Sequence, residues 1–364
     1  MGRGSAEEVA AWERAIPGGH SSAAQELNHL QCGLTPNSPL RAVIVGCGLI
    51  GQKRAAALSP GTVTVCCDID APRAIQLSAR CRGSVAVTDW QAAVQRADVD
   101  MVFAATTHDL LAPVAAAAAR AGKHVLIEKP GARRAAELDA VAEAAALAGV
   151  QVRVGFNHRF HRALRQAREI FESGALGEMM FVRGRYGHGG RVGYDKEWRA
   201  EPECSGGGEL IDQGAHLIDL SRWFLGDFAR VRGAAPTYFW NMPVEDNGFL
   251  LLETARGQVA FLHASWTEWK NLFSLEIAGS VGKLEINGLG GSYGTERLTW
   301  YKMSPQMGPP ETIAWEYPMA DDSWQQECAA FVEDIRTGRA PDPGVADAQA
   351  ALRVIEEVYR EKGA

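Results

Sequence analysis

The sequence of 364 residues lacks three features that would assign it to particular classes of protein. None of its seven cysteines forms a C-x-x-C pair, and no set of residues has the spacing of a metal site. No apolar stretch approaches the roughly 18–20 residues that span a membrane. Positive charge is not in excess, since 37 Lys and Arg face 44 Asp and Glu, a formal net charge of −7. These absences favour a cytoplasmic protein that binds neither membranes nor nucleic acids.

The composition is that of a globular protein, with 46% hydrophobic and 22% charged residues. It excludes collagen-like and largely disordered chains. The length suggests two domains, at about 150 residues per domain. Residues 1–39 differ in pattern from the rest of the chain and end in a proline-bearing linker, so they are interpreted as an N-terminal extension with no assigned role.

From residue 40 to 156 the pattern alternates between short apolar runs rich in Val and Ile and Ala-rich helical stretches. Runs of this kind are typical of strands that are buried on both faces of a parallel sheet. We therefore expect a doubly wound α/β domain here. The expected strands cover residues 42–45, 63–67, 99–105, 124–127 and 150–156.

Residues 157–364 have a different pattern, in which polar and apolar residues alternate along the expected strands. This alternation predicts an α+β domain with a large, mainly antiparallel, open-faced sheet, one face of which packs on helices. Two closing helices are expected within residues 323–361. The expected strands cover residues 178–186, 249–255, 258–267, 272–278, 283–287, 298–302 and 312–317.

A dinucleotide-binding fingerprint comes directly after the first expected strand, as Gly46-Cys47-Gly48-Leu49-Ile50-Gly51. The first glycine permits the tight turn, the second lets the backbone approach a pyrophosphate, and the third lets helix and strand pack closely. Asp68 ends the next strand, where a carboxylate binds the ribose hydroxyls and repels a 2′-phosphate. The sequence therefore predicts a Rossmann domain that binds NAD, with NADP disfavoured by Asp68.

Two further clusters could carry chemistry. Glu128-Lys129-Pro130 comes at the end of the expected strand 124–127, where a lysine can hold a hydroxyl or polarise a carbonyl, although an ordinary exposed lysine is the alternative. Asp212 and His216 are four residues apart, so a helix would place them on one face, with the carboxylate orienting the imidazole for proton transfer. A solvated ion pair is the alternative for these two residues. Glu209 and Asp219 are expected to be cap or surface residues.

Together, the glycine fingerprint, the Glu128-Lys129-Pro130 triplet and the run from Gly206 to Asp219 resemble the glucose–fructose oxidoreductase/inositol dehydrogenase/rhizopine catabolism (Gfo/Idh/MocA) family. The resemblance covers about residues 40–364. It implies a nicotinamide-dependent oxidoreductase acting on a secondary hydroxyl of a sugar or cyclitol, and a sheet that mediates a homodimer or homotetramer. By motif, Lys129 would contact the reacting oxygen, His216 would be the acid/base and Asp212 its partner.

The resemblance also implies roles for neighbouring segments. Glu128, Thr106, Thr107 and His108 would contact the cofactor, although the family often has Thr-Pro-Asn at 106–108 and a histidine where this chain has Leu111. Residues 156–160 resemble the segment that borders the substrate pocket, which makes Asn157 a candidate substrate residue.

The charge of residues 151–200 suggests a substrate class. Ten basic residues face five acidic ones there, a local net charge of +5. Arginine forks match phosphate and carboxylate oxygens, and aromatic planes suit a sugar or a nucleobase. We therefore predict an anionic, nucleotide-activated sugar, with a solvated basic surface as the alternative. The expected substrate residues are Asn157, Arg159, Tyr186, Arg191, Trp198, Asp212 and His216.

Other functions stay open at this point. The enzyme could be a neutral-sugar or inositol dehydrogenase, or an NAD-dependent glycosidase that recycles its cofactor and releases no NADH. A non-catalytic sugar or NAD sensor is a further alternative, which the presence of Lys129, Asp212 and His216 disfavours. A role in specialised or antibiotic-sugar biosynthesis is one interpretation of the nucleotide-sugar prediction. The direction of the reaction is not indicated.

Overall fold

The computed structural model describes residues 39–306 and 308–362. The predicted extension, residues 1–39, lies outside the described residues except for Pro39. Leu40–Ala364 forms one compact unit, which contains two sheets. The predicted boundary at 156/157 falls between the last strand of the first sheet and the first strand of the second, and it stays a prediction.

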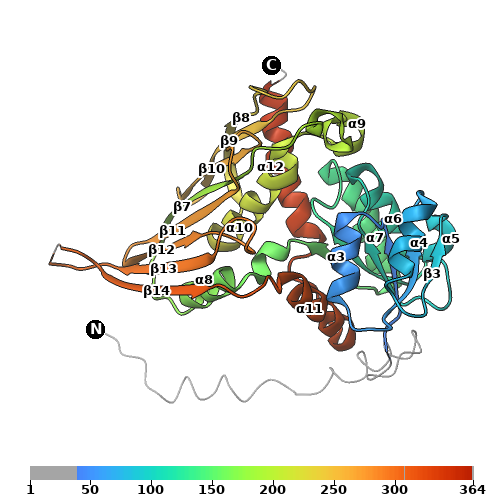
Figure 1. The fold of residues 1–364 in the computed structure, drawn as a ribbon. Coiled ribbons are helices and arrows are strands. Elements are labelled where there is room, and N and C mark those ends of the chain that lie inside the picture. Colours follow the sequence, from blue (N-terminus) through green and yellow to red (C-terminus); the bar gives the residue numbers. More distant parts are fainter. Residues whose placement is uncertain (1–38, 307, 363–364) are drawn as a thin grey trace, which may run out of the picture. The chain divides into compact units, whose positions relative to one another are not determined.

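The first sheet has six parallel strands in the order β3-β2-β1-β4-β5-β6 (Figure 1). The strand order changes direction between β1 and β4, which places a ligand crevice at the carboxyl ends of these strands. The predicted parallel α/β domain is confirmed, but β3 was not expected, because none of its three residues is buried. The strands are β1 (Ala42–Val45), β2 (Val63–Cys67), β3 (Val85–Val87), β4 (Met101–Ala104), β5 (His124–Glu128) and β6 (Val152–Gly155).

Alanine-rich helices connect these strands. Alanine suits them because it favours the helical conformation and lets a helix lie close to a sheet. They are α3 (Leu49–Ala57), α4 (Ala71–Ser78), α5 (Trp90–Val94), α6 (His108–Arg120), the 3₁₀ turn η1 (Ala135–Leu138) and α7 (Asp139–Ala148).

The second sheet has eight strands in the order β14-β13-β12-β11-β7-β10-β9-β8. Every neighbouring pair is antiparallel except β7 and β10, so the predicted mainly antiparallel sheet is confirmed. Strand β8 was not expected, because Val231 is its only buried residue. The strands are β7 (Met179–Gly187), β8 (Phe228–Ala234), β9 (Asn247–Thr254), β10 (Val259–Ser265), β11 (Leu272–Gly279), β12 (Gly282–Asn287), β13 (Glu296–Lys302) and β14 (Glu311–Tyr317).

Helices cover one face of this sheet (Figure 1). Alternate strand residues turn to the other face, where Leu251 and Phe261 are about half exposed and lie opposite each other in register. The helices and turns are η2 (Asn157–Phe160), α8 (Arg162–Glu172), η3 (Tyr194–Lys196), η4 (Trp198–Ala200), α9 (Pro202–Ser205), the π-helical turn η5 (Leu210–Gly214), α10 (Ala215–Leu225), α11 (Ser323–Thr337) and α12 (Val345–Lys362).

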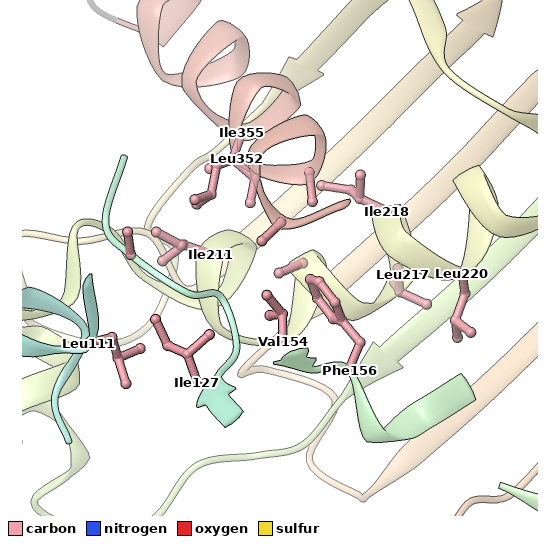
Figure 2. Close-up of a cluster of buried hydrophobic side chains, with 14 of the residues drawn as sticks. Leu111, Ile127, Val154, Phe156, Ile211, Leu217, Ile218, Leu220, Leu352 and Ile355 are labelled. Atoms are coloured by element: carbon pink, nitrogen blue, oxygen red, sulfur yellow. The ribbon is translucent and has the colours of Figure 1, made fainter. Parts of the chain in front are cut away.

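A continuous apolar core joins the two sheets (Figure 2). It includes Ile127 and Val154 from the first sheet, Ile211 from η5, Ile218 from α10 and Leu352 from α12. All five side chains are fully buried. Because burying such a side chain stabilises the fold by roughly 1.5–3 kcal/mol, this core fixes the end of β5 relative to η5. It thereby sets the position of Lys129 relative to Asp212.

None of the helices in the described part of the chain is both long and apolar enough to cross a membrane. The predicted cytoplasmic location stays a prediction.

Candidate active site

The glycine fingerprint connects β1 to the N-terminus of α3. Gly46 has φ +94°, and a Cβ there would lie 2.3 Å from the carbonyl oxygen of Ala105. A Cβ at Gly51 would lie 1.9 Å from the carbonyl oxygen of Gly46, so this glycine lets helix and turn pack together. A Cβ at Gly48, by contrast, would meet no atom within 4 Å. The loop therefore leaves open space before the N-terminus of α3, where a pyrophosphate group is stabilised.

Asp68 is held at the end of β2 by backbone groups. Its Oδ2 accepts a hydrogen bond from the Cys47 amide at 2.7 Å, and its Oδ1 accepts one from the Asp70 amide at 2.9 Å. The carboxylate thus stands beside the fingerprint loop and lines the same cavity. These groups fit the adenosine half of NAD, because the carboxylate can accept hydrogen bonds from two ribose hydroxyls.

One cavity of about 580 Å³ extends from the fingerprint loop to the second sheet. Gly51 lies behind this cavity as a packing residue, and Arg159 does not line it. The predicted residues that the cavity brings together are Gly46, Gly48, Leu49, Ile50, Asp68, Thr106, Thr107, His108, Glu128, Lys129, Asn157, Tyr186, Arg191, Trp198, Asp212 and His216.

His108 and Glu128 line this cavity, and each forms a hydrogen bond with a protein group that does not line it. The Nδ1 atom of His108 lies 2.8 Å from the carbonyl oxygen of Ser205, and the ring meets Trp198 edge-on at 4.9 Å. The Oε1 atom of Glu128 accepts a hydrogen bond from Nε of the buried Arg54 at 2.5 Å. Glu128 therefore anchors the end of β5, directly before the cis peptide bond between Lys129 and Pro130.

Asp212 binds two cations. Its Oδ1 lies 2.5 Å from Nζ of Lys129, and its Oδ2 accepts a hydrogen bond from Nε of Arg199 at 3.0 Å. Lys129 also donates to the carbonyl oxygen of Asp212 at 2.7 Å. Burial raises the pKa of Asp212, but Lys129 and Arg199 outweigh burial and hold this pKa well below its usual value. Asp212 is therefore a carboxylate that fixes the ammonium group of Lys129.

The predicted pair of Asp212 and His216 does not form. The imidazole Nδ1 of His216 is buried and has no hydrogen-bond partner among residues 39–306 and 308–362, and both carboxylate oxygens of Asp212 are taken by Lys129 and Arg199. Asp212 lies in the π-helical turn η5 and His216 in the following helix α10, so the two residues do not share one regular α-helix. The prediction that Asp212 orients His216 is therefore wrong.

His216 instead stacks on His158, with ring centroids 3.6 Å apart and planes 18° from parallel. Phe156 meets the His216 ring edge-on at 5.8 Å. Burial, together with the positive charge of Lys129, holds the pKa of His216 well below the usual 6.5. The imidazole is therefore neutral near neutral pH.

Arg159 does not face the substrate region, and its predicted role is wrong. Its guanidinium donates to both carboxylate oxygens of Asp219, at 2.9 and 2.6 Å. The same group reaches Asp342 at 2.5 Å and Asp347 at 3.1 Å. Arg159 is thus a buried cation that ties η2 to α10 and to the start of α12. Asp219, expected to be a cap or surface residue, is buried as the partner of this cation.

The basic side chains of residues 151–200 lie in different parts of the structure. Of its arginines, only Arg191 and Arg199 line the cavity, and they pair with Glu197 and Asp212. Others form ion pairs elsewhere, such as Arg183 with Glu276 across β7 and β11. The local charge of +5 therefore does not converge on the cavity.

Several cavity residues were missed by the sequence analysis. His158 belongs to the segment 156–160 that the resemblance already indicated, and His161 directly follows it, so the proximity of both to the cavity could have been inferred. Tyr293 and Asp321 come from loops far along the chain, and no motif marks them. Glu209, which does not line the cavity, was expected to be a cap or surface residue, yet it is fully buried, and neither of its carboxyl oxygens has a hydrogen-bond partner in the described part of the chain.

Comparison with protein families gives two matches. Residues 40–156 match the oxidoreductase family with an NAD-binding Rossmann fold, and residues 164–285 match the GFO/IDH/MocA C-terminal domain. Together these matches cover more than half of the chain.

Three known proteins illustrate the similarity. The dTDP-3,4-didehydro-2,6-dideoxy-alpha-D-glucose 3-reductase of Streptomyces violaceoruber is 30% identical, over 88% of this chain and 93% of its own. The levoglucosan dehydrogenase of Pseudarthrobacter phenanthrenivorans is 33% identical, but this match covers 47% of this chain and only 44% of the relative's length. The crystal structure of GenD2 from gentamicin A biosynthesis, in complex with NAD, is 25% identical, with a TM-score of 0.76 over 90% of this chain and 95% of that one.

The glycine cradle, the position of Asp68 and the lysine and histidine in one cavity agree with these matches. The predicted cofactor NAD and the predicted class of enzyme are confirmed. The chain therefore belongs to the Gfo/Idh/MocA family of NAD-binding oxidoreductases, and it is an NAD-dependent sugar dehydrogenase or reductase.

Proposed function

We propose that the protein interconverts a secondary hydroxyl of a sugar and the corresponding ketone, with Lys129 and His216 as the catalytic residues. The observation that carries this proposal is their arrangement in one cavity. An ammonium group fixed by Asp212 and a neutral imidazole both line the cavity that begins at the glycine fingerprint.

The two side chains have complementary tasks. Lys129 donates a hydrogen bond to the reacting oxygen and stabilises the negative charge that develops there. His216 accepts the hydroxyl proton during oxidation and returns it during reduction. The low pKa of His216 leaves the imidazole unprotonated and so able to accept the hydroxyl proton, but it also makes the ring a weaker base than an imidazole whose pKa lies near the operating pH. Bound NAD would supply the hydride acceptor, and Lys129 and His216 would hold the reacting hydroxyl group of the sugar in the same cavity.

For the substrate we propose a nucleotide-activated sugar. Two observations support this choice: the side chain of Arg191, at the cavity edge, is 66% exposed, and a reductase of a dTDP-sugar is similar over nearly the whole chain. A guanidinium group at this edge can form a bidentate pair of hydrogen bonds with a diphosphate. A neutral sugar is the second candidate, because Arg191 and Arg199 already pair with Glu197 and Asp212.

Salt dependence separates these two substrate classes. We expect KM for dTDP-glucose to rise several-fold as the ionic strength increases from 0.01 M to about 0.15 M, because the Debye length falls from about 30 Å to about 8 Å. KM for levoglucosan or myo-inositol should stay constant over the same range. NADH formation with these three sugars is the measurement, and a salt-independent KM for dTDP-glucose would contradict the nucleotide-sugar proposal.

We also propose that the helix-free face of the second sheet pairs with another copy of the chain, as a homodimer or homotetramer. Leu251 and Phe261 support this, because two large apolar side chains lie exposed side by side on adjacent strands. Light scattering should give a mass that is a multiple of 39.3 kDa, and Phe261→Glu should reduce it to that of the monomer. A monomeric wild-type protein at micromolar concentration would contradict this proposal.

A further inference from the structure

One wall of the cavity carries a histidine that the proposed reaction does not use. His161 is 4% exposed and lines the cavity, and its Nδ1 lies 2.9 Å from Oε2 of Glu296. Glu296 is itself buried, and its Oε1 accepts a hydrogen bond from the Ala163 amide at 2.9 Å. Since Glu296 occupies Nδ1, the nitrogen of His161 that is left for a ligand is Nε2.

Glu296 also determines which ring nitrogen of His161 carries a hydrogen. Burial raises the pKa of Glu296, but the interactions with His161 and the hydrogen bonds from the amides of Ala163 and Gly290 together outweigh burial, so that this pKa is lower than usual. A carboxylate is only an acceptor, and it therefore keeps a proton on Nδ1 of His161. In the neutral ring, Nε2 is then a hydrogen-bond acceptor.

Asp321 provides a second acceptor beside His161. Its Oδ1 accepts a hydrogen bond from the Ser323 amide at 2.9 Å and lies 3.9 Å from Nδ1 of His161. Within residues 39–306 and 308–362, no lysine or arginine forms an ion pair with Asp321. The negative charge of Asp321 is therefore available at the cavity wall, which this residue also lines.

Gly290 keeps both acceptors uncovered. It has φ +55°, and a Cβ at this position would lie 3.2 Å from Oδ2 of Asp321 and 3.2 Å from Cε1 of His161. A side chain here would thus crowd both groups on the cavity side. Glycine leaves a recess that is bordered by an imidazole and a carboxylate.

The recess lies close to the proposed reaction centre. The ring centroid of His158 is 3.6 Å from that of His216 and 5.5 Å from that of His161. His216 and His161 therefore lie on either side of His158 and close to each other. One sugar ring with its substituents can contact both.

We propose that His161 and Asp321 form a recognition subsite for hydroxyl groups of the sugar that do not react. This inference rests on the proposed function, since it concerns the same substrate. Two acceptors match the O–H donors of a sugar with neighbouring free hydroxyls. A phosphate or carboxylate at this point would be repelled by Asp321, and a deoxy position would leave the acceptors without a partner. An anionic group of the substrate is thus expected at Arg191 rather than here.

Two substitutions of His161 separate ligand recognition from a structural role. His161→Asn keeps an amide donor near the position of Nδ1, and with it the tie to Glu296, but removes Nε2. His161→Gln places an amide nearer to Nε2 and weakens that tie. The subsite predicts that Asn raises KM for the sugar roughly 10-fold to 100-fold, the effect of leaving a buried polar group unpaired. It also predicts that Gln raises KM less than Asn does.

Asp321→Asn removes the negative charge and should lessen discrimination against anionic sugars. Asp322→Asn is its matched control, because the neighbouring Asp322 pairs with Arg162 and does not line the cavity. The probes for all variants are D-glucose, levoglucosan, myo-inositol and dTDP-glucose, tested with the NAD-loaded full chain.

The expected result is a higher KM for the sugar, a kcat that changes less than KM, and an unchanged Kd for NAD. A purely structural role of His161 predicts the opposite order. His161→Gln would then raise KM more than His161→Asn does, and it would lower the Tm of the protein. A contact with the cofactor instead predicts a weaker Kd for NAD. Either result would overturn the subsite.

A failure of the proposed function can be distinguished from a failure of the subsite, because it would abolish oxidation of the sugars in the wild type as well. If none of the four sugars is oxidised, calorimetry with the NADH-loaded protein decides the inference. Weaker binding of any of them to His161→Asn than to the wild type would support the subsite without turnover. Equal binding, or no binding of any of the four sugars, would overturn it.

Discussion

Replacing His216 with glutamine is expected to slow turnover by roughly 10²–10⁴-fold, the contribution of a general acid/base. The imidazole is buried in the cavity beside Lys129, and its low pKa keeps it in the basic form. Glutamine fills similar space but cannot take up the hydroxyl proton. The measurement is kcat for NADH formation, together with the Kd for NAD, which should not change because the fingerprint loop is intact.

His263→Gln is the matched control for this variant. His263 lies on the helix-free face of the second sheet, outside the cavity, so its replacement should leave kcat unchanged. If His216→Gln retained wild-type turnover with a folded protein, the assignment of His216 as the acid/base would be wrong.

Replacing Arg54 with methionine is expected to destabilise the protein by about 3–5 kcal/mol, the cost of removing one partner from a buried ion pair. Arg54 is fully buried on α3 and binds Glu128 at the end of β5 and Glu327 on α11, each at 2.5 Å. Without the guanidinium, two buried carboxylates lose their shared cation. Denaturant unfolding measures the loss.

The same variant also tests how Lys129 is positioned. Because Glu128 directly precedes Lys129, the loss of Arg54 should lower kcat in the protein that still folds. Arg54→Met combined with Glu327→Gln removes one of the two stranded charges, so the double variant should be more stable than Arg54→Met alone. A single variant as stable as the wild type would show that these ion pairs contribute nothing to the fold.

Local patterns in the sequence predict much of this molecule. The glycine fingerprint and Asp68 lie within about twenty residues, so their chemistry can be inferred from a strand, a turn and a helix. The alternation of polar and apolar residues predicts the second sheet, since one of its faces is covered by helices. Strands β3 and β8 were not predicted because almost none of their side chains are buried.

The errors involve partners that are distant in the sequence. Asp212 was assigned to His216 by helical spacing, but Lys129 lies 83 residues away and takes its Oδ1. Arg159 was assigned to the substrate, but its carboxylate partners lie 60 to 188 residues further along the chain. Spacing along a chain shows which groups share an element, whereas competition between charges for a partner is decided only in the folded molecule.

The charge of residues 151–200 is another feature whose role is decided only in the folded molecule. The excess of arginine in residues 151–200 suggested a basic pocket, yet the structure pairs the cavity arginines with Glu197 and Asp212. The clue to the substrate is therefore the local arrangement: an exposed guanidinium of Arg191 at one edge and the acceptors of His161 and Asp321 at another wall.

The most direct test of the central claim is the stoichiometry of NADH formation with the NAD-loaded protein and the four sugars. The account predicts that at least one sugar is converted to its ketone with an equimolar amount of NADH, and that His216→Gln slows the formation of both products to the same extent. Sugar consumption without net NADH would indicate a glycosidase that recycles its cofactor. Binding of sugar without any conversion would indicate a sensor, and either result would contradict the account.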